Sequence, residues 1–503
     1  MGGSEQDLVV AAEAYVGVLG SERLIEFPVT ALDRVGVPVW ATWWVAPTGL
    51  STSSTSGLGY GSTELRARVG ALGECVEHVC SRQALLGKPT ESGSLRQMRS
   101  THGADRVVDP RLLGLPAGSA YDDDRPLAWW PLSRLHDARV SDEQVWAPVE
   151  YVASAVADLP APAPGGWLIM PVTNGLGAGA TLQQAVAHGV LEILQRDGNG
   201  LSFRALDTQR VLDLDGVSDA ETLRTLELLR GAGVEVLAKL AATDFGMANI
   251  DVVGMAPHDD LLSASACGEA VHPDREIALR KAVLEFASAR ARKQLMHGPL
   301  DAVRAIAPPA IVAQMSQVDS DQEEARVLAA MVEWLCLPQT EWEPLLRATV
   351  LGQIDTIRFT DLPTTATDQN TLLGEVEGRL RGEGFDILVA DLSPRDAAGA
   401  HAVKVLIPGL EVETVAYARI GERNVARLLD MGRDDLVRVG QRPPGRVSVH
   451  LTAEAEQRLG GPAWLDRAAL DAVPGRLFPL YREPGWQTAQ SALRSAAQSP
   501  MRM

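Results

Sequence analysis

Three stretches of the chain end in a glutamate that follows the same pattern of small residues. In each stretch an alanine is followed four positions later by alanine or glycine, and three positions after that by glutamate; the glutamates are Glu74, Glu192 and Glu285. Residues at this spacing share one face of a helix, so the pattern predicts three similar helices with a carboxylate at the same position. Gathered carboxylates hold divalent cations, and such cations in turn hold phosphates.

The helix that carries Glu74 is expected to begin after Thr63, whose hydroxyl suits an N-cap, and the glycine-rich stretch 57–61 before it is expected to form a turn. The same Gly-x-Gly-x-Thr spacing at 177–181 predicts a second glycine-rich turn and a second helix after Thr181; a third helix is expected to begin near Pro273 or Asp274. Any one of these helices alone is better explained by ordinary packing with solvated acids at its end. Three aligned copies favour a shared site.

Composition excludes several classes of partner. The chain has 503 residues, 46% hydrophobic and 22% charged, and a net charge of −19 with no run of Lys or Arg. Nucleic acid and anionic membranes are therefore not expected as partners. No apolar stretch reaches the roughly 18 residues of a membrane span, and the N-terminus lacks a basic-then-apolar signal, which predicts a cytoplasmic protein. The four cysteines form no CxxC pair, which favours buried thiols over disulfides or a zinc site.

Strand-like and helix-like segments are mixed along the chain, which predicts an α+β fold with antiparallel or mixed sheets. Helices are expected at 8–19 and 318–345 and through most of the last sixty residues, with a stiff proline-rich linker at 160–164. The expected strands are 24–27, 37–43, 127–133, 145–153, 167–171, 234–240, 250–255, 386–391 and 402–407.

Taken in order, five segments resemble the YcaO family. They are Thr-x-Leu-Asp-Arg-x-Gly-x-Pro-Val at 30–39, Ala-x-x-x-Ala-Leu-Gly-Glu-x-x-Glu at 67–77, Thr-Asn-Gly-Leu-Gly-Ala-Gly-x-Thr at 173–181 continuing to Arg-Asp at 196–197, His-Pro-Asp through Arg at 272–290, and Asp-Leu-Ser through Glu at 391–411. The resemblance implies a YcaO-type domain over 1–415, with a polar insertion near 86–126 and an acidic helical segment at 318–345, followed by a helical extension at 416–503.

The resemblance further implies ATP- and Mg²⁺-dependent phosphorylation of a backbone amide oxygen in a ribosomally made peptide, after a nucleophile attacks the carbonyl. A Cys, Ser or Thr side chain gives an azoline, sulfide gives a thioamide, an amine gives an amidine, and water would give cleavage. Carried over onto this chain, the metal-binding positions are Glu74, Glu77, Glu192 and Gln195, and the ATP-binding positions are Arg196, Glu285 and Arg290.

The chain departs from the family pattern at several of these positions. Gln195 replaces the acidic member of the second pair, which removes a unit of charge from a metal site. The other departures are Leu58, Gly70, Ala180, Gln184 and Ser288, and the proline-rich C-terminal tail of many azoline-forming members is absent. They favour an alternative function, a catalytically degenerate YcaO scaffold that binds a precursor peptide or a partner enzyme.

The resemblance implies partners as well as cofactors. A precursor peptide is expected, and an E1-like, leader-binding or sulfur-supplying protein would act with the chain if leader capture or sulfur delivery is needed. The apolar helices near the C-terminus would suit a homodimer, although they would equally cover the core.

Overall fold

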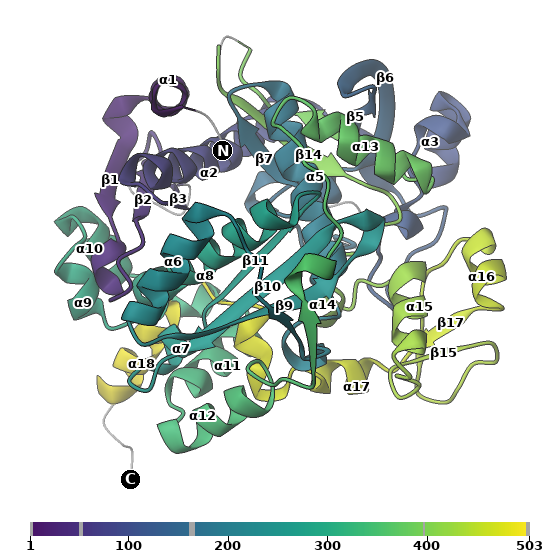
Figure 1. The fold of residues 1–503 in the computed structure, drawn as a ribbon. Helices are drawn as coiled ribbons and strands as arrows, with labels where there is room; N and C mark the ends of the chain where they lie inside the picture. The colour runs from purple at the N-terminus through teal and green to yellow at the C-terminus, as the bar shows by residue number, and fades with distance from the viewer. Residues whose placement is uncertain (1–3, 50–53, 160–165, 396–397, 499–503) are drawn as a thin grey trace.

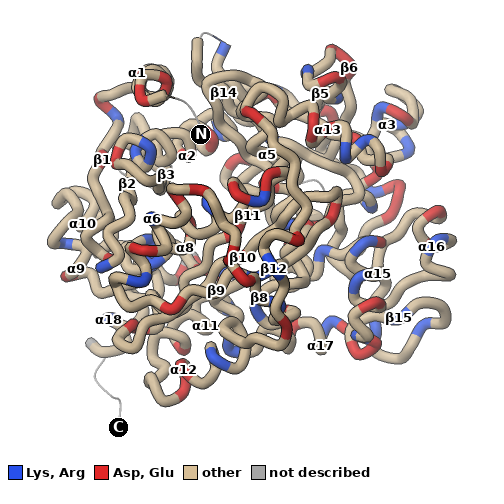
Figure 2. The backbone as a smooth tube through the Cα atoms, viewed as in Figure 1, with Lys and Arg blue, Asp and Glu red and all other residues tan. Residues whose placement is uncertain are grey.

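The computed structural model describes residues 4–49, 54–159, 166–395 and 398–498 (Figure 1). Most neighbouring strands are antiparallel, and β8 pairs with β12 in parallel, which confirms the predicted α+β class with mixed and antiparallel sheets. Acidic and basic residues are spread along the whole described chain (Figure 2). None of the helices in these ranges is long and apolar enough to cross a membrane.

The described strands form four sheets. The first has the order β1-β2-β3, the second β11-β10-β9-β8-β12, the third β4-β5-β13-β14-β7 with β6 beside β5, and the small fourth β15-β17-β16. The first strands are β1 (Leu24–Pro28), β2 (Val39–Trp44), β3 (Thr55–Tyr60), β4 (Glu91–Gly93), β5 (Leu127–His136), β6 (Arg139–Pro148) and β7 (Leu176–Gly179). They are followed by β8 (Arg210–Asp213), β9 (Glu235–Ala242), β10 (Ala248–Met255), β11 (Cys267–His272) and β12 (Asp355–Arg358). The last are β13 (Leu388–Asp391), β14 (His401–Leu406), β15 (Val437–Val439), β16 (Val447–Ser448) and β17 (Ala463–Leu465). As a result β3, β7 and β11 each lie at the edge of a different sheet.

A long helix follows each of these three edge strands. Helix α2 (Glu64–Gly87) follows β3, α5 (Leu182–Asn199) follows β7, and α8 (Arg275–His297) follows β11. Their N-caps are Thr63, Thr181 and Asp274, whose side chains each accept a hydrogen bond from a backbone N–H of the first helical turn, so all three predicted helix starts are confirmed.

The remaining helices pack around these three units. Their bounds are Glu5–Leu19 (α1), Leu95–His102 (α3), Val149–Val152 (α4), Ala220–Gly231 (α6), Leu261–Ala264 (α7), Leu300–Arg304 (α9), Pro309–Ser316 (α10), Ala325–Leu335 (α11), Gln339–Ala348 (α12), Leu372–Gly382 (α13), Thr414–Tyr417 (α14), Glu422–Asp430 (α15), Ala453–Leu459 (α16), Arg467–Ala472 (α17) and Thr488–Gln498 (α18). Helices α2, α5 and α8 contribute to three separate hydrophobic clusters. Each of the three helices therefore packs into a different part of the core.

Three local predictions are corrected. The glycine-rich stretches expected as turns are the strands β3 and β7, because their glycines allow a helix to pack directly on the strand. The expected strand 167–171 is irregular, since the buried Glu150 carboxylate accepts the N–H groups of Leu168 (2.5 Å) and Ile169 (3.0 Å) in place of a neighbouring strand. The expected strand 145–153 ends at Pro148 and continues as α4.

Two longer predictions need revision. The expected helix 318–345 is broken into α11 and α12 at Pro338, which cannot donate the backbone bond that a continuous helix requires. The extension 416–503 contains the sheet β15-β17-β16 as well as helices, and its apolar residues pack against Ala117, Leu201 and Leu206. The linker expected at 160–164 lies outside the described residues, and the domain boundary near 415 stays a prediction.

Candidate functional site

Each repeated helix lies directly on the strand that precedes it. A Cβ atom added to Gly59 on β3 would lie 1.9 Å from the carbonyl oxygen of Ala67, and one added to Gly177 on β7 would lie 2.2 Å from that of Ala185. On β11 the corresponding distance from Gly268 to the Ala282 oxygen is 2.1 Å. No side chain fits at these positions. The helix backbone can lie this close to the strand only because the strand has glycines and the helix has small residues there.

The three repeated glutamates are held in the same way. Backbone N–H groups of Leu58 and Gly175 donate to Glu74 (2.7 Å) and Glu192 (3.0 Å), and that of Glu269 donates to Glu285 at 3.4 Å. Each donor belongs to, or directly precedes, the strand on which the helix packs. The shared sequence pattern therefore encodes a strand–helix unit that fixes its carboxylate against backbone N–H groups.

The three units form a closed ring. Besides its own strand, α2 contacts β7, α5 contacts β11, and α8 contacts β3. This arrangement brings the glutamates of all three helices into one neighbourhood, as the sequence predicts. The ring places the candidate site where the edges of three sheets meet.

The carboxylates between α2 and α5 repel one another. Burial and the negative charges of Glu192 and Glu74 raise the pKa of Glu77 well above its ordinary value. Burial likewise raises the pKa of Glu192, against the opposing charge of Arg196. The pKa of Lys404 on β14 falls to about 7 because the side chain is buried, although the charges of Glu192 and Glu77 act in the opposite direction; its ammonium donates to the carbonyl of Val172 at 2.5 Å.

The third glutamate faces a different set of partners. The Tyr60 hydroxyl donates to Glu285 at 3.3 Å, and burial together with the charge of Glu269 raises the pKa of Glu285 to about 7. A carboxylate with a raised pKa is stabilised by any cation that reaches it. Glu285 is therefore a third acid of the ring, after Glu77 and Glu192, that a bound cation would stabilise.

A second cluster is centred on Glu269 of β11, which sequence reasoning did not identify. Its carboxylate accepts from Arg196 (3.2 Å), Asn199 (2.6 Å) and Arg204 (2.9 Å), and the amide nitrogen of Gln195 lies 3.5 Å away. Although burial acts in the opposite direction, Arg204 and Arg196 hold the pKa of Glu269 below its ordinary value. An isolated charge within the apolar stretch 267–272 is the sequence signal that would have revealed it.

The position of Arg290 corrects its predicted role at phosphate. Its guanidinium is fully buried and donates to Asp33 (3.1 Å) and to both oxygens of Asp259 (2.8 and 2.9 Å). Arg290 lies five positions after Glu285, on a different face of α8, whereas Arg292 lies seven positions after it and shares its face. Arg292 lines a cavity with Glu285, and among the described residues its Nε atom is buried without a hydrogen-bond partner. The helical period alone would have selected Arg292.

Several departures from the family pattern have local structural roles. The Gln184 side chain accepts the Ala180 N–H at 3.1 Å while Thr181 caps the helix, so both ends of this turn are satisfied. Gly70 lies against Gly59, where an added Cβ would already be 3.2 Å from the Gly59 Cα. These residues are explained by packing and capping at the ends of α5 and α2.

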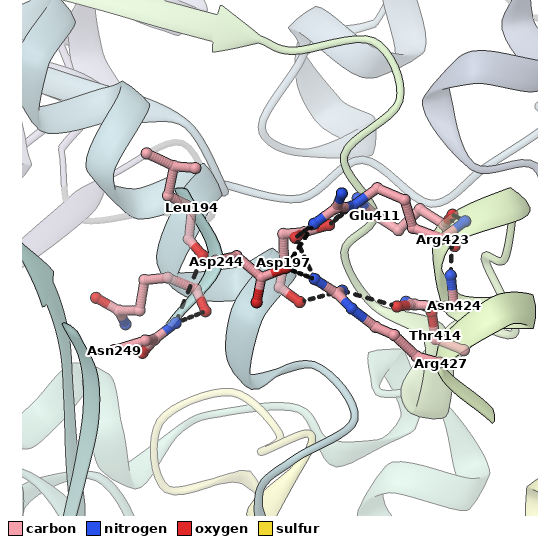
Figure 3. A network of polar contacts seen from close by, with 10 residues as sticks. Leu194, Asp197, Asp244, Asn249, Glu411, Thr414, Arg423, Asn424 and Arg427 are labelled. Atoms are coloured by element: carbon pink, nitrogen blue, oxygen red, sulfur yellow. Dashed lines mark hydrogen bonds and ion pairs between the residues drawn. The ribbon is translucent and has the colours of Figure 1, made fainter. Parts of the chain in front are cut away.

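The C-terminal end of α5 is anchored from two sides (Figure 3). Asp197 accepts from Arg423 (2.9 Å) and Arg427 (2.8 Å) of α15, and Asn249 of β10 donates to the Gln195 carbonyl at 3.0 Å. Glu411 accepts N–H groups of Gly421, Arg423 and Asn424 and so caps α15. This network fixes the C-terminal end of α5, from which Arg196 and Asn199 donate hydrogen bonds to Glu269.

The side chains of the site are of the types that bind Mg²⁺ and a phosphate-bearing ligand. Within the described ranges no group of three His, Cys, Asp or Glu side chains is close enough to hold a metal ion unaided. The donors present are carboxylate oxygens, which Mg²⁺ prefers, and Mg²⁺ ordinarily takes one or two of them together with phosphate oxygens and waters. The buried Nε atoms of Arg196, Arg204 and Arg292 have no hydrogen-bond partner among the described residues. The residues present thus fit the predicted cofactors.

Comparison with known proteins gives the family context. Residues 58–411 match the family model described as YcaO cyclodehydratase, ATP- and Mg²⁺-binding, in agreement with the predicted cofactors. An uncharacterized protein of Methanothermobacter thermautotrophicus is 29% identical over 418 residues, covering 81% of this chain and 94% of its own length.

Two solved structures share the fold. The structure of YcaO from Methanopyrus kandleri bound with AMPPCP and Mg²⁺ has a TM-score of 0.55 and 20% identity, covering 83% of this chain and 93% of its own. A heterocyclase in complex with substrate and cofactor has a TM-score of 0.59 and 18% identity over 82% of this chain, and the chain spans only 53% of that protein.

Proposed function

The chain belongs to the YcaO family, and we propose that it uses ATP and Mg²⁺ to phosphorylate a backbone amide oxygen in a ribosomally made peptide. Phosphorylation converts the amide oxygen, a poor leaving group, into a good one. The product is an azoline, a thioamide or an amidine, according to whether the attacking group is a side chain of the peptide, sulfide or an amine. The proposal draws on the family's description and on the heterocyclase that has the same fold.

The observation that carries this proposal is the ring of strand–helix units, which gathers the glutamates of α2, α5 and α8. Glu74, Glu77 and Glu192 would hold Mg²⁺ beside the phosphates, with the amide of Gln195 as a neutral neighbour. Bound Mg²⁺ neutralises the charge that moves during phosphoryl transfer. Burial and neighbouring negative charge destabilise Glu77 and Glu192 as anions, so a bound cation would stabilise them.

Arginines on two sides of the ring would meet phosphate oxygens. Arg196 lies between Glu192 (3.9 Å) and Glu269 (3.2 Å), which keeps its guanidinium in place and charged. Arg292 and Glu285 face the cavity along one side of α8. The planar guanidinium suits phosphate recognition because its N–H donors point in fixed directions. We assign the phosphate contact to Arg292 in place of Arg290.

A non-catalytic scaffold is the second candidate function. Gln195 supports it, because its amide replaces a charged ligand at the one helix position where the second carboxylate pair would be complete. The other departures weigh less, since Gln184 and Gly70 have capping and packing roles. A scaffold would bind peptide or partner protein with no dependence on ATP or Mg²⁺.

Calorimetric titration with AMPPCP, with and without Mg²⁺, tests the proposal. Wild-type protein should bind the nucleotide only with Mg²⁺, and Glu74→Gln should weaken this binding by roughly tenfold or more because a charged ligand is lost. Glu64→Gln, on an exposed turn of the same helix, is the matched control and should bind as wild type. Nucleotide binding that is absent, or equal in wild type and Glu74→Gln, would reject this assignment of the site.

A further inference from the structure

A cavity of about 520 Å³ is lined both by carboxylates of the ring and by Trp486 of the C-terminal segment. Its inner end is lined by Tyr60, Glu74 and Glu285, and its outer end by Met296 and Trp486. Glu285 and Met296 are eleven residues apart on α8, or about 16 Å along the helix. The volume lies within the range of small-molecule sites.

Trp486 comes from the C-terminal extension, outside the residues that match the family model. Its indole packs edge-on against Trp43 of β2, with ring centroids 4.5 Å apart. The neighbouring Gln487 N–H donates to the Met296 carbonyl at 2.7 Å, at the outer end of the same cavity. Trp486 is half-buried, so one part of the ring is held by Trp43 while another faces the cavity.

The segment that carries Trp486 is fastened to the C-terminal end of α8. The Glu483 carboxylate pairs with Lys293 and His297, and the charge of Lys293 is the main reason that its pKa lies well below the ordinary value despite burial. The Gln487 side chain donates to the carbonyls of Leu295 (3.2 Å) and Gly298 (3.0 Å). These bonds hold Gln487 in a left-handed conformation (φ of 59°), which a non-glycine residue adopts only when its surroundings impose it.

The polarity of the cavity changes along its length. Glu74 and Glu285 line the part near the ring, and Met296 and Trp486 line the part near the C-terminal segment. Arg292 lies between Glu285 and Met296 on α8, and His78 and the hydroxyls of 54–56 also line the cavity. A nucleotide has the same order of chemistry, from anionic phosphates through ribose hydroxyls to a planar base. Aromatic side chains bind bases by stacking, with little dependence on the base's hydrogen-bonding groups.

We propose that Trp486 is the platform on which the nucleobase of the bound nucleotide stacks, so that the C-terminal extension forms part of the nucleotide site. The inference rests on the proposed function for the phosphate end of the cavity and adds the base end. The phosphates lie between Glu285 and Arg292, and the base lies beyond Arg292, between the Trp486 ring and Met296. The segment 483–490 thereby positions a recognition residue that the family-matched part of the chain does not contain.

Calorimetry with two Mg²⁺-loaded probes separates the two ends of the cavity. Trp486→Leu should weaken AMPPCP binding by roughly tenfold or more, because the stacking surface is lost, and should leave inorganic tripolyphosphate binding unchanged. Trp486→Phe, which keeps an aromatic ring, should retain most of the nucleotide affinity. Trp464→Leu, a change to a half-buried tryptophan on β17, is the matched control and should behave as wild type for both probes.

Each other outcome overturns the inference in a recognisable way. Unchanged AMPPCP affinity in Trp486→Leu places the base elsewhere, while the proposed function stands. Equal losses for AMPPCP and tripolyphosphate show that Trp486 only supports the fold of the site. If wild-type protein binds neither probe, the proposed function fails and the inference fails with it. Circular dichroism of each variant confirms that it is folded before titration.

Discussion

The acid groups on the two sides of α5, one facing α2 and the other facing β11, differ in charge balance, although they belong to one ring. On the α2 side, Glu77 and Glu192 are buried close to each other, and their pKa values are raised. On the β11 side, Glu269 is more deeply buried, yet Arg196 and Arg204 keep its pKa below the ordinary value. On the first side Lys404 and Arg196 do not offset the effect of burial, and Mg²⁺ is expected to bind there, whereas on the second side the arginines do offset it.

The difference arises at equivalent helix positions. Glu77 follows Glu74 by three residues, and Gln195 follows Glu192 by three. The Gln195 amide can donate toward Glu269, whereas a glutamate there would face a like charge. At position 195 the chain thus has a neutral amide in place of a metal-binding carboxylate. This amide contacts Glu269, whose carboxylate is already bound by Arg196 and Arg204. We infer that the strongest Mg²⁺ position lies between α2 and α5.

Neutralising Glu77 gives the largest expected effect on activity. Glu77→Gln removes a ligand charge while nearly keeping the shape of the side chain, and it should lower ATP-dependent modification of a cognate peptide by about a hundredfold or more. The free energy of unfolding should stay the same or rise, because a buried acid with a raised pKa is destabilising when ionised. Product mass analysis and urea denaturation measure the two effects. A parallel loss of stability and activity would mean that the residue is structural.

Arg290 and Arg292 on α8 should respond in opposite ways. Arg290→Ala leaves Asp33 and Asp259 buried without their main partner, so it should lower the free energy of unfolding by about 3–5 kcal/mol. Arg292→Ala should change stability little and weaken AMPPCP binding by roughly tenfold, through the lost phosphate contact. Urea denaturation and calorimetry provide the measurements. Loss of nucleotide binding in a stable Arg290→Ala protein would restore the original prediction for that residue.

Restoring the acid on α5 tests the comparison directly. Gln195→Glu makes the second pair resemble the first, and it should strengthen Mg²⁺-dependent nucleotide binding by about tenfold if the ligand geometry is retained. Without Mg²⁺ the new charge beside Glu269 should lower stability. Gln184→Glu, at the start of the same helix, is the control for added charge. Weaker Mg²⁺-dependent binding in Gln195→Glu would show that the neutral amide belongs to the working site.

The smallest expected effect is a dependence of stability on pH. Since the pKa of Glu285 rises from 4.5 to about 7 on folding, the native state retains a proton that the unfolded chain releases. Its contribution to stability is therefore present below about pH 4.5 and is lost as the pH rises toward 7. Glu285→Gln should flatten this part of the stability curve, and Mg²⁺ with AMPPCP should oppose the decline. Identical slopes in wild type and Glu285→Gln would contradict the assigned shift.

Some elements were predictable because their signals are local. Thr63, Thr181 and Asp274 cap the three helices as expected, since an N-cap depends on residues within one turn. The apolar runs 234–240 and 250–255 predict two strands, and both form, paired as β9 and β10. The glycines of β3 and β7 were assigned to turns because glycine is common in turns, whereas here it marks close backbone contact, which depends on a distant helix.

The sequence by itself determined that three helices carry a carboxylate at equivalent positions, because spacing along a helix follows from its period. It also determined the family, through five ordered segments. Tertiary structure alone decided which charges meet: Glu269, Lys404 and Trp486 reach the site from elements far away in the chain, and Arg290 is turned away from it. The physical reason is that charge balance and burial depend on packing between sheets, which no local pattern specifies.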